Sequence, residues 1–293
     1  MSSEFGVRSS ESNSKTCNPQ SAISNQKGMA LLMTILIITL LSLLIIDINS
    51  RSLLAITRAK NSVNSLKAYY IMRSGVSAAM GFLEMDARES GAVDTLSEDW
   101  ASGVKDFPVG DGTVTVDIVD EASKFNINTL VSGQGKIQND DEKSAVARFG
   151  RLLKGLGIEE GLSGKVAEWL KMNREGLSYT FRDISELLLV PDFSSEVFKK
   201  VEGYVTIHSS RKININTVGK EVLAALSPTL NETLIEAIMD YRKEHPFRAI
   251  NDLGQVPGLS DSALRMTFDD ALDVKSSDFT VVTEARVSGT VRK

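Results

Sequence analysis

The stretch Lys27-Gly28-Met29-Ala30-Leu31-Leu32-Met33 opens an apolar run that decides the fold of this chain. From Met29 to Ile46 no residue is charged, and the only hydroxyl side chains are Thr34, Thr39 and Ser42. A helix of about 20 such residues crosses a bilayer core about 30 Å thick, and its backbone polar groups all pair within the helix. We therefore expect a transmembrane helix over 29–46, after a short polar leader and before a long soluble chain.

An ordinary secretory signal is the first alternative, since it also places basic residues before an apolar stretch. Its apolar part would be shorter, and a cleavage site of small residues would follow directly. Here the run ends in Asp47-Ile48-Asn49-Ser50-Arg51, and the helical pattern continues beyond it. The single cysteine, Cys17, lies in a leader that is too polar for a lipoprotein signal. The apolar run therefore fits an anchor better than a removed signal.

A helical pattern extends past the membrane run. No proline occurs between Gln26 and Pro108, and apolar residues recur at helical spacings as one stripe. We expect one helix from about Met29 to Met85, its first half in lipid and its second half laid on a globular domain. Residues 2–26 are rich in Ser, Asn and Gln without an apolar period, which predicts an unstructured leader. The stripe consists of Leu53, Ile56, Val63, Leu66, Tyr70, Val76, Met80 and Leu83.

Two later segments have the alternation typical of β-strands. They are Thr113–Val119 and Phe279–Val287, both rich in valine and threonine. Between them the pattern is helical from about Asp140 to Leu272. A strand-forming set divided by a long helical stretch predicts an α+β fold in which an all-α domain is inserted into a β-containing one.

The helical stretch contains an internal repeat. The sequence Phe-Arg-Asp-Ile-Ser-Glu-Leu at 181–187, followed by Val190-Pro191, reappears as Phe-Arg-Ala-Ile-Asn-Asp-Leu at 247–253, followed by Val256-Pro257. An Asn-Ile-Asn-Thr tetrapeptide precedes each copy, at 126–129 and 214–217. Each copy is therefore predicted to be one supersecondary unit, with Thr217 as the N-cap of the next helix in the second copy.

The composition points away from an enzyme. The formal net charge is −5, so no basic surface for a polyanion is predicted. Only two histidines are present, His208 and His245, and no serine lies in a Gly-x-Ser-x-Gly turn. No thiol remains if the leader is removed. We expect a non-enzymatic protein with no catalytic residues and no cofactor.

Two acidic clusters leave structural calcium open. Asn139-Asp140-Asp141-Glu142 and the group of Asp269, Asp270 and Asp273 each offer several oxygens. Neither has the alternating ligand spacing and the glycine of a known calcium loop. The acids at 140–141 also suit a helix N-terminus, where the helix dipole favours negative charge. No metal ligand is assigned.

Nucleic-acid binding is the main alternative function. Residues 213–268 resemble the helix-hairpin-helix domain of ComEA-type DNA-uptake receptors, which grip phosphate through backbone N–H groups of a Gly-hydrophobic-Gly turn. In this chain the second glycine is Ser260, and the first repeat has Pro191-Asp192-Phe193-Ser194, with an aspartate facing any phosphate. The hairpin at Ser227-Pro228-Thr229-Leu230 has no glycine. The sequence therefore favours a scaffold over DNA binding.

Nearly the whole chain resembles the K-type minor pseudopilins of type II secretion systems, the general secretion pathway protein K family. Gly28–Leu32 resembles the prepilin cleavage site of that family, and Asp120–Thr129 resembles its strand exit. Trp169, Asp183–Pro191 and Ile213–Leu226 match further elements in the family's order. Where the family has an acidic run after the tryptophan, this chain has Leu-Lys-Met-Asn-Arg at 170–174, which weakens any transfer of a calcium site.

The resemblance implies a pilin-like fold, with a long N-terminal helix and a small antiparallel sheet interrupted by a large all-α domain with helix-hairpin-helix-like repeats. The implied prepilin-type leader is 1–28, and the implied transmembrane helix is 29–46, continuing as an amphipathic helix to about 85. The pilin-like β domain would consist of 86–136 and 273–293. The inserted α domain would be 137–272, with repeats at about 137–200 and 213–272.

The resemblance also implies a role. The protein would cap the tip of the pseudopilus, initiate its assembly and contribute to protein export across the outer membrane. Its partners would be other minor pseudopilins in a tip complex, the major pseudopilin and prepilin peptidase, with no nucleic acid. One span would anchor it in the inner membrane, leader in the cytoplasm and C-terminal domain in the periplasm. The alternative is a helix-hairpin-helix DNA-binding protein of a competence, DNA-uptake or type IV pilus machine.

Five residues are the candidate sites under this resemblance. Cleavage between Gly28 and Met29 would leave Met29 as an N-methylated terminus. In most pilins the fifth mature residue is a glutamate that neutralises the terminal amine of a neighbouring subunit. A tip subunit has no such neighbour above it, and Met33 avoids an unpaired carboxylate that would cost about a few kcal/mol in an apolar setting. Leu66 and Tyr70, in the stripe, are expected to contact the other pseudopilins.

Overall fold

The computed structural model describes residues 19–89, 93–131, 140–172 and 180–293. The chain divides into two compact units, Met1–Val63 and Asn64–Lys293. In chain order the elements are α1 (Pro19–Glu89), α2 (Asp99–Ser102), β1 (Val104–Val109), β2 (Gly112–Asp120), η1 (Glu121–Ser123), β3 (Phe125–Asn126), η2 (Ile127–Leu130), α3 (Asp140–Gly155), α4 (Leu162–Met172), η3 (Ile184–Leu189), α5 (Ser195–Val201), β4 (Val205–Thr206), β5 (Ile213–Asn214), α6 (Lys220–Leu226), α7 (Glu232–Glu244), η4 (Ile250–Gln255), α8 (Ser262–Arg265), η5 (Asp269–Ala271), β6 (Leu272–Asp273), β7 (Phe279–Val287) and β8 (Thr290–Arg292), where η marks a 3-10 helix.

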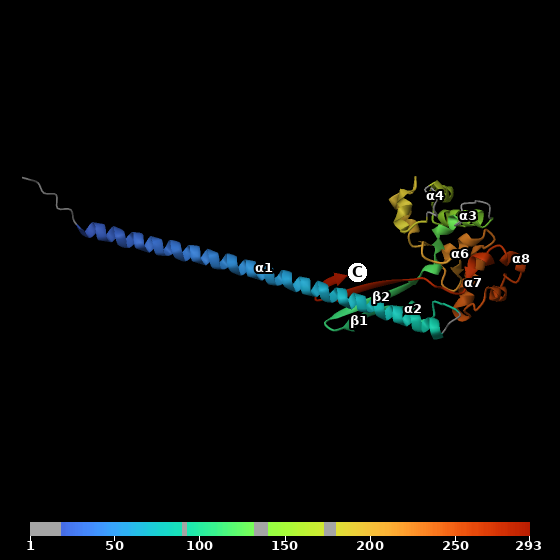
Figure 1. Cartoon of the computed structure of the whole chain (residues 1–293), viewed down its shortest axis with the longest axis horizontal. Coiled ribbons are helices and arrows are strands. Elements are labelled where there is room, and N and C mark those ends of the chain that lie inside the picture. The colour runs from blue at the N-terminus through green and yellow to red at the C-terminus, as the bar shows by residue number, and fades with distance from the viewer. Residues whose placement is uncertain (1–18, 90–92, 132–139, 173–179) are drawn as a thin grey trace, which may run out of the picture. The chain divides into compact units, whose positions relative to one another are not determined.

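Helix α1 contains the whole apolar run and extends it in both directions (Figure 1). It begins at Pro19, a residue suited to the first helical turn because the N–H groups of that turn have no partner within the helix. The expected helix is therefore present but longer than 29–85. The expectation that residues 2–26 are unstructured is wrong from Pro19 onward. Residues 1–18, with Cys17, lie outside the described residues.

The second unit contains a four-stranded antiparallel sheet with the order β1-β2-β7-β8. Strands β2 and β7, both predicted, pair along their whole length, from Gly112 opposite Val287 to Asp120 opposite Phe279. The sequence did not predict β1 and β8. In β1, the register shifts near Asp106, which has a φ of 49°, and Pro108 interrupts the alternation. These features also blunt the outer edge of the sheet against pairing with another strand.

Small residues of α1 pack on one face of this sheet (Figure 1). Ala68, Ile71 and Ala79 are buried against a group of strand residues. Gly75 lies among them, and a Cβ there would come within 3.0 Å of Val114 Cγ2. The helix and the sheet therefore approach each other closely here, and a larger residue would require Val114 to shift. The strand residues of this core are Val114, Val116, Ala285 and Val287.

The predicted apolar stripe is not the face of α1 that packs on the sheet. Within the second unit, Leu66, Tyr70 and Met80 are exposed, and only Val76 and Leu83 of the stripe are half-buried. The expectation that the stripe rests on the globular domain is therefore wrong. Alanine and glycine, which the hydrophobic pattern ranks low, form the packed face because they let the helix approach closely.

The inserted helical domain consists of two similar units. The first runs from β3 through η2, α3, α4, η3 and α5 to β4, and the second runs from β5 through α6, α7, η4, α8 and η5 to β6. A short parallel pair closes each of them: β3 pairs with β4, and β5 pairs with β6. The first unit thus begins at Phe125, earlier than the expected start at 137, because the Asn-Ile-Asn-Thr entry is part of it.

A single hydrophobic core fills the helical domain. Its largest fully buried side chains include Phe149, Phe247 and Phe268, and Phe125 stacks on Phe149 with ring centroids 5.5 Å apart. The prediction of Thr217 as the N-cap of α6 is wrong, because Gly219 occupies the N-cap position and the Thr217 hydroxyl donates a hydrogen bond to Asp120. The predicted α+β fold, with a small antiparallel sheet interrupted by a helical domain, is confirmed.

Candidate functional site: the membrane helix and the assembly face

The first part of α1 is apolar enough to cross a membrane. An 18-residue window in this helix reaches a mean hydropathy of 2.9, and none of that window is buried in the described structure. Its three hydroxyl side chains donate back to carbonyl oxygens of the same helix: Thr34 to Leu31, Thr39 to Leu36 and Ser42 to Ile38, each at 2.8 Å. The hydroxyls therefore need no partner in lipid. Past the run, Arg51 and Asp47 form an ion pair at 2.9 Å, suited to an aqueous boundary.

The two residues predicted for processing, Gly28 and Met29, and the predicted assembly residue Met33 lie on this part of α1. Met29 is 64% exposed, Met33 is 59% exposed, and a Cβ at Gly28 would meet no atom within 4 Å. The described fold therefore does not itself require the glycine. Leu66 and Tyr70 belong to the second unit, so the structure does not gather the five candidate residues into one site.

Leu66, Tyr70 and Met80 form what we call the assembly face of α1. Their exposed fractions are 56%, 60% and 63%, large for apolar side chains. The ring of Tyr70 meets that of Tyr69 edge to face at 5.7 Å. On a helix, residues 66, 70 and 80 lie within about 80° of one another, so these three side chains share one side of α1.

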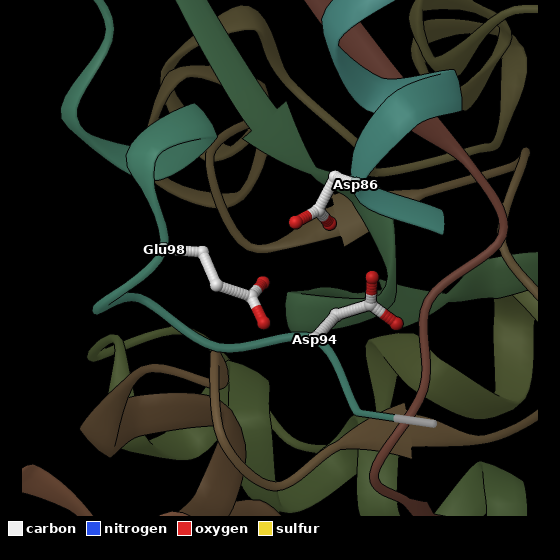
Figure 2. Close-up of side chains that lie close together, drawn as sticks. All are labelled: Asp86, Asp94 and Glu98. Carbon is white, nitrogen blue, oxygen red and sulfur yellow. The ribbon is translucent and has the colours of Figure 1, made fainter. Parts of the chain in front are cut away.

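Three acidic side chains converge at the end of α1, and the sequence did not single them out. Asp86 lies in the last turn of α1, whereas Asp94 and Glu98 precede α2, and their carboxylate oxygens lie within 4.8 Å of one another (Figure 2). Asp94 Oδ2 accepts the N–H of Ser276 at 2.7 Å, and Glu98 Oε2 accepts the indole N–H of Trp100 at 2.6 Å. Among the described side chains, this is the group that could hold a cation.

Burial raises the pKa of Asp94 above its ordinary value, and the negative charges of Glu98, Asp120 and Asp86 raise it further. The hydrogen bond from Ser276 acts in the opposite direction. The calcium candidates from the sequence lie elsewhere: Asp270 pairs with Arg148 at 2.7 Å, and the side chains at 139–142 lie outside the described residues.

Asp120 connects the sheet to the second helical unit. It ends β2 and is 3% exposed. Its Oδ2 accepts hydrogen bonds from the hydroxyls of Thr217 and Ser276, and its Oδ1 accepts the N–H of Ala122 at 2.8 Å. Burial raises the pKa of Asp120, although these hydrogen bonds lower it. The three donors come from different segments of the compact unit Asn64–Lys293, and Asp120 therefore connects these segments.

The hairpin turns lack the features of a phosphate site. In the first helical unit the turn residue is Asp192, with a φ of 67° and an ion pair to Lys165 at 2.6 Å. In the second helical unit Gly258 has a φ of 87°, and Ser260 occupies the position where a second glycine would be needed. The carboxylate in the first turn would repel a phosphate.

Comparisons with known proteins agree with this architecture. Two family models, both described as type II secretion system (T2SS), protein K, match residues 123–210 and 213–275, which together exceed half of the chain. The type II secretion system protein K of Pseudomonas aeruginosa is 28% identical over 258 residues, covering 78% of this chain and 75% of that protein. The protein of the same name from Aeromonas hydrophila is 27% identical, covering 90% of each chain.

A solved structure has the same fold. A chain of the GspK-GspI-GspJ complex from the type 2 secretion system of enterotoxigenic Escherichia coli matches with a TM-score of 0.64. It is 20% identical, and the match covers 80% of this chain and 91% of that one. The two family models match the two helical units in chain order. The chain therefore belongs to the type II secretion system protein K family and is a pseudopilin, a structural rather than an enzymatic component.

Proposed function

We propose that this chain caps the tip of the type II secretion pseudopilus, initiates its assembly and so contributes to protein export across the outer membrane. It does so in a complex with two other minor pseudopilins, to which the major pseudopilin is added. Family membership supports this role, as does the solved relative, which is a chain of a complex of three proteins, GspK, GspI and GspJ.

The exposure of the assembly face carries the proposal. Leu66 and Tyr70 lie on α1 away from Ala68, Ile71 and Ala79, the residues that pack on the sheet. A long helix whose one side is buried by its own domain and whose other side exposes large apolar residues is built to pack against other helices.

The membrane end of α1 fits the same role. Prepilin peptidase cuts after Gly28 and leaves an N-methylated Met29, and the remaining span holds the protein in the inner membrane with its globular domain in the periplasm. Met33 puts an apolar side chain where an interior subunit carries a carboxylate. A subunit with no neighbour above it has no terminal amine to neutralise, so it needs no carboxylate at this position.

Co-purification of the full chain with its two partner pseudopilins from detergent tests the proposal. Leu66→Glu and Tyr70→Glu should each reduce the recovered complex at least about tenfold, since each places a charge in an apolar contact. Met85→Glu is the matched control, because Met85 is 58% exposed on the same helix but outside the assembly face. Wild-type recovery of both partners with Leu66→Glu and Tyr70→Glu would contradict the proposal.

A further inference from the structure

A small apolar cavity lies between α1 and the start of the sheet, on a side of the helix that the assembly face does not include. Its volume is about 160 Å³. Gly75, Ala78 and Phe82 line it from α1, and Trp100, Val104 and Ile118 line it from α2, β1 and β2. Small-molecule pockets usually measure about 300–1,000 Å³. This cavity, which we call the Trp100 slot, therefore has room for one side chain rather than for a metabolite.

The walls of the slot are fixed by contacts within the chain. The indole N–H of Trp100 donates to Glu98, and its ring meets Phe279 edge to face at 5.1 Å. Gly103, with a φ of 59°, allows the chain to turn from α2 into β1, and a Cβ there would lie 2.7 Å from the carbonyl oxygen of Val116. A preformed cavity of this kind loses little conformational entropy when it is filled.

The rim of the slot is apolar and accessible. Phe82 is 43% exposed and Val104 is 45% exposed, and Asp99 is the one charged residue of the lining. An anionic group would lose its hydration here and meet the negative charge of Asp99, and the other lining side chains offer little to a polar group. The slot therefore selects an aliphatic or aromatic side chain.

We propose that the Trp100 slot receives a single apolar side chain from the helix of a second pseudopilin, different from the one on the assembly face. This inference rests on the proposed function, which places two pseudopilins beside this chain. Tyr70 and Phe82 are 12 residues apart on α1, which puts them about 120° apart around the helix. Tyr70 and the slot therefore lie on different sides of α1, so two neighbours can bind the helix without overlapping.

Filling the slot from within tests the proposal. Ala78→Phe places a ring into the cavity, and Met85→Phe places the same ring two turns along α1, outside both the lining and the assembly face. In co-purification of the full chain, Ala78→Phe should lose one partner at least about tenfold and retain the other, whereas Met85→Phe should retain both. Val104→Asp, a rim variant at an exposed position, should lose the same partner and decides the question if Ala78→Phe fails to fold.

Trp100 also reports directly on the slot. The chain has two tryptophans, and Trp169→Phe leaves Trp100 as the only one, with the stacked ring beside Phe181 conserved. Adding the purified slot partner should shift the Trp100 emission, and Ala78→Phe should abolish the shift. Recovery of both partners with Ala78→Phe and Val104→Asp, together with an unchanged emission, would overturn the slot proposal. If instead Leu66→Glu and Tyr70→Glu retain both partners, the assembly face is wrong while the slot result stands by itself.

Discussion

Asn216 and Phe247 hold each other through two hydrogen bonds: the backbone N–H of Phe247 donates to Asn216 Oδ1 at 2.9 Å, and Asn216 Nδ2 donates to the carbonyl oxygen of Phe247 at 3.0 Å. The first helical unit repeats the arrangement with Asn128 and Phe181, at 2.8 and 3.1 Å. In each unit the second asparagine of the Asn-Ile-Asn-Thr entry thus fixes the Phe-Arg link. This explains physically why the two motifs occur together twice.

Replacing Asn216 by alanine should destabilise the helical domain by about 1–3 kcal/mol, because the N–H and carbonyl groups of the buried Phe247 would lose their partners. Asn128→Ala should cost less, since Asn128 is half-buried and water can replace its amide. Thermal unfolding of both variants, followed by tryptophan fluorescence, gives the order. Equal or reversed losses would contradict the argument from burial, and an unchanged stability with Asn216→Ala would show that its two bonds do not stabilise the link.

The sequence predicted those features that depend on local pattern. The alternation of valine and threonine located β2 and β7, and the repeated Phe-Arg and Asn-Ile-Asn-Thr motifs located the two helical units. It did not predict β1, where Asp106 and Pro108 hide the alternation, or the packed face of α1, where Ala68 and Gly75 carry no hydrophobic signal.

Some candidate sites could also be predicted from a local sequence pattern, and others could not. Gly28 and Met29 follow from a local motif, but Asp86, Asp94 and Glu98 converge only through the path of the chain between α1 and α2. Trp100 is similar, because its slot is built by four elements. Such sites depend on tertiary contacts that no spacing in the sequence reveals.

Asp94→Asn should stabilise the second unit at pH 7. The folded state raises the pKa of Asp94, so its ionised form is disfavoured there relative to the unfolded chain. The stability that this group contributes is complete below the unfolded pKa, about 3.9, and is lost as the pH rises through the folded pKa. An asparagine keeps the acceptor for Ser276 without the charge. The gain, about 0.2–1 kcal/mol, should vanish below about pH 4 in unfolding curves.

Asp111→Asn gives the opposite sign and serves as the control. Hydrogen bonding and ion pairing with Lys67 lower the pKa of Asp111, so its contribution is present above the unfolded pKa and is lost as the pH falls through the folded one. This variant should be slightly less stable at pH 7. A loss of stability with Asp94→Asn at neutral pH would argue against charge repulsion in the acidic cluster.

Gly28→Leu should block processing by prepilin peptidase, because a side chain prevents close approach to the backbone at the scissile bond. A Cβ at this position meets open space, so the variant should fold and enter the membrane normally. Intact mass spectrometry should find the wild type starting at N-methylated Met29 and the variant with its leader. A mature wild-type terminus at Met1, or beyond Arg51, would rule out the assigned leader.

Met33→Glu should impair assembly of the pseudopilus. A carboxylate without a partner in an apolar setting must either stay protonated, with a raised pKa, or weaken the helix contact. Met33→Leu preserves the apolar character and should assemble as the wild type does. Recovery of the tip complex and secretion by cells measure the effect, and normal secretion with Met33→Glu would remove the physical argument for the tip position.

The globular part from about residue 52 onward should bind DNA only weakly and without site preference. Asp192 and Ser260 replace the glycines of a phosphate-binding turn, and the net charge of the chain is −5. Fluorescence titration with labelled duplex at physiological salt measures the affinity. Submicromolar binding would favour the DNA-uptake alternative.

The insertion leaves and re-enters the sheet at adjacent residues, because Asp120 and Phe279 are register partners in β2 and β7. The whole insertion therefore acts as a single loop that connects β2 to β7, and its length does not alter the pairing of these strands. A two-residue turn could in principle close the same hairpin. The same junction therefore offers a site at which the helical domain can be replaced by a foreign domain without changing the pairing of β2 and β7.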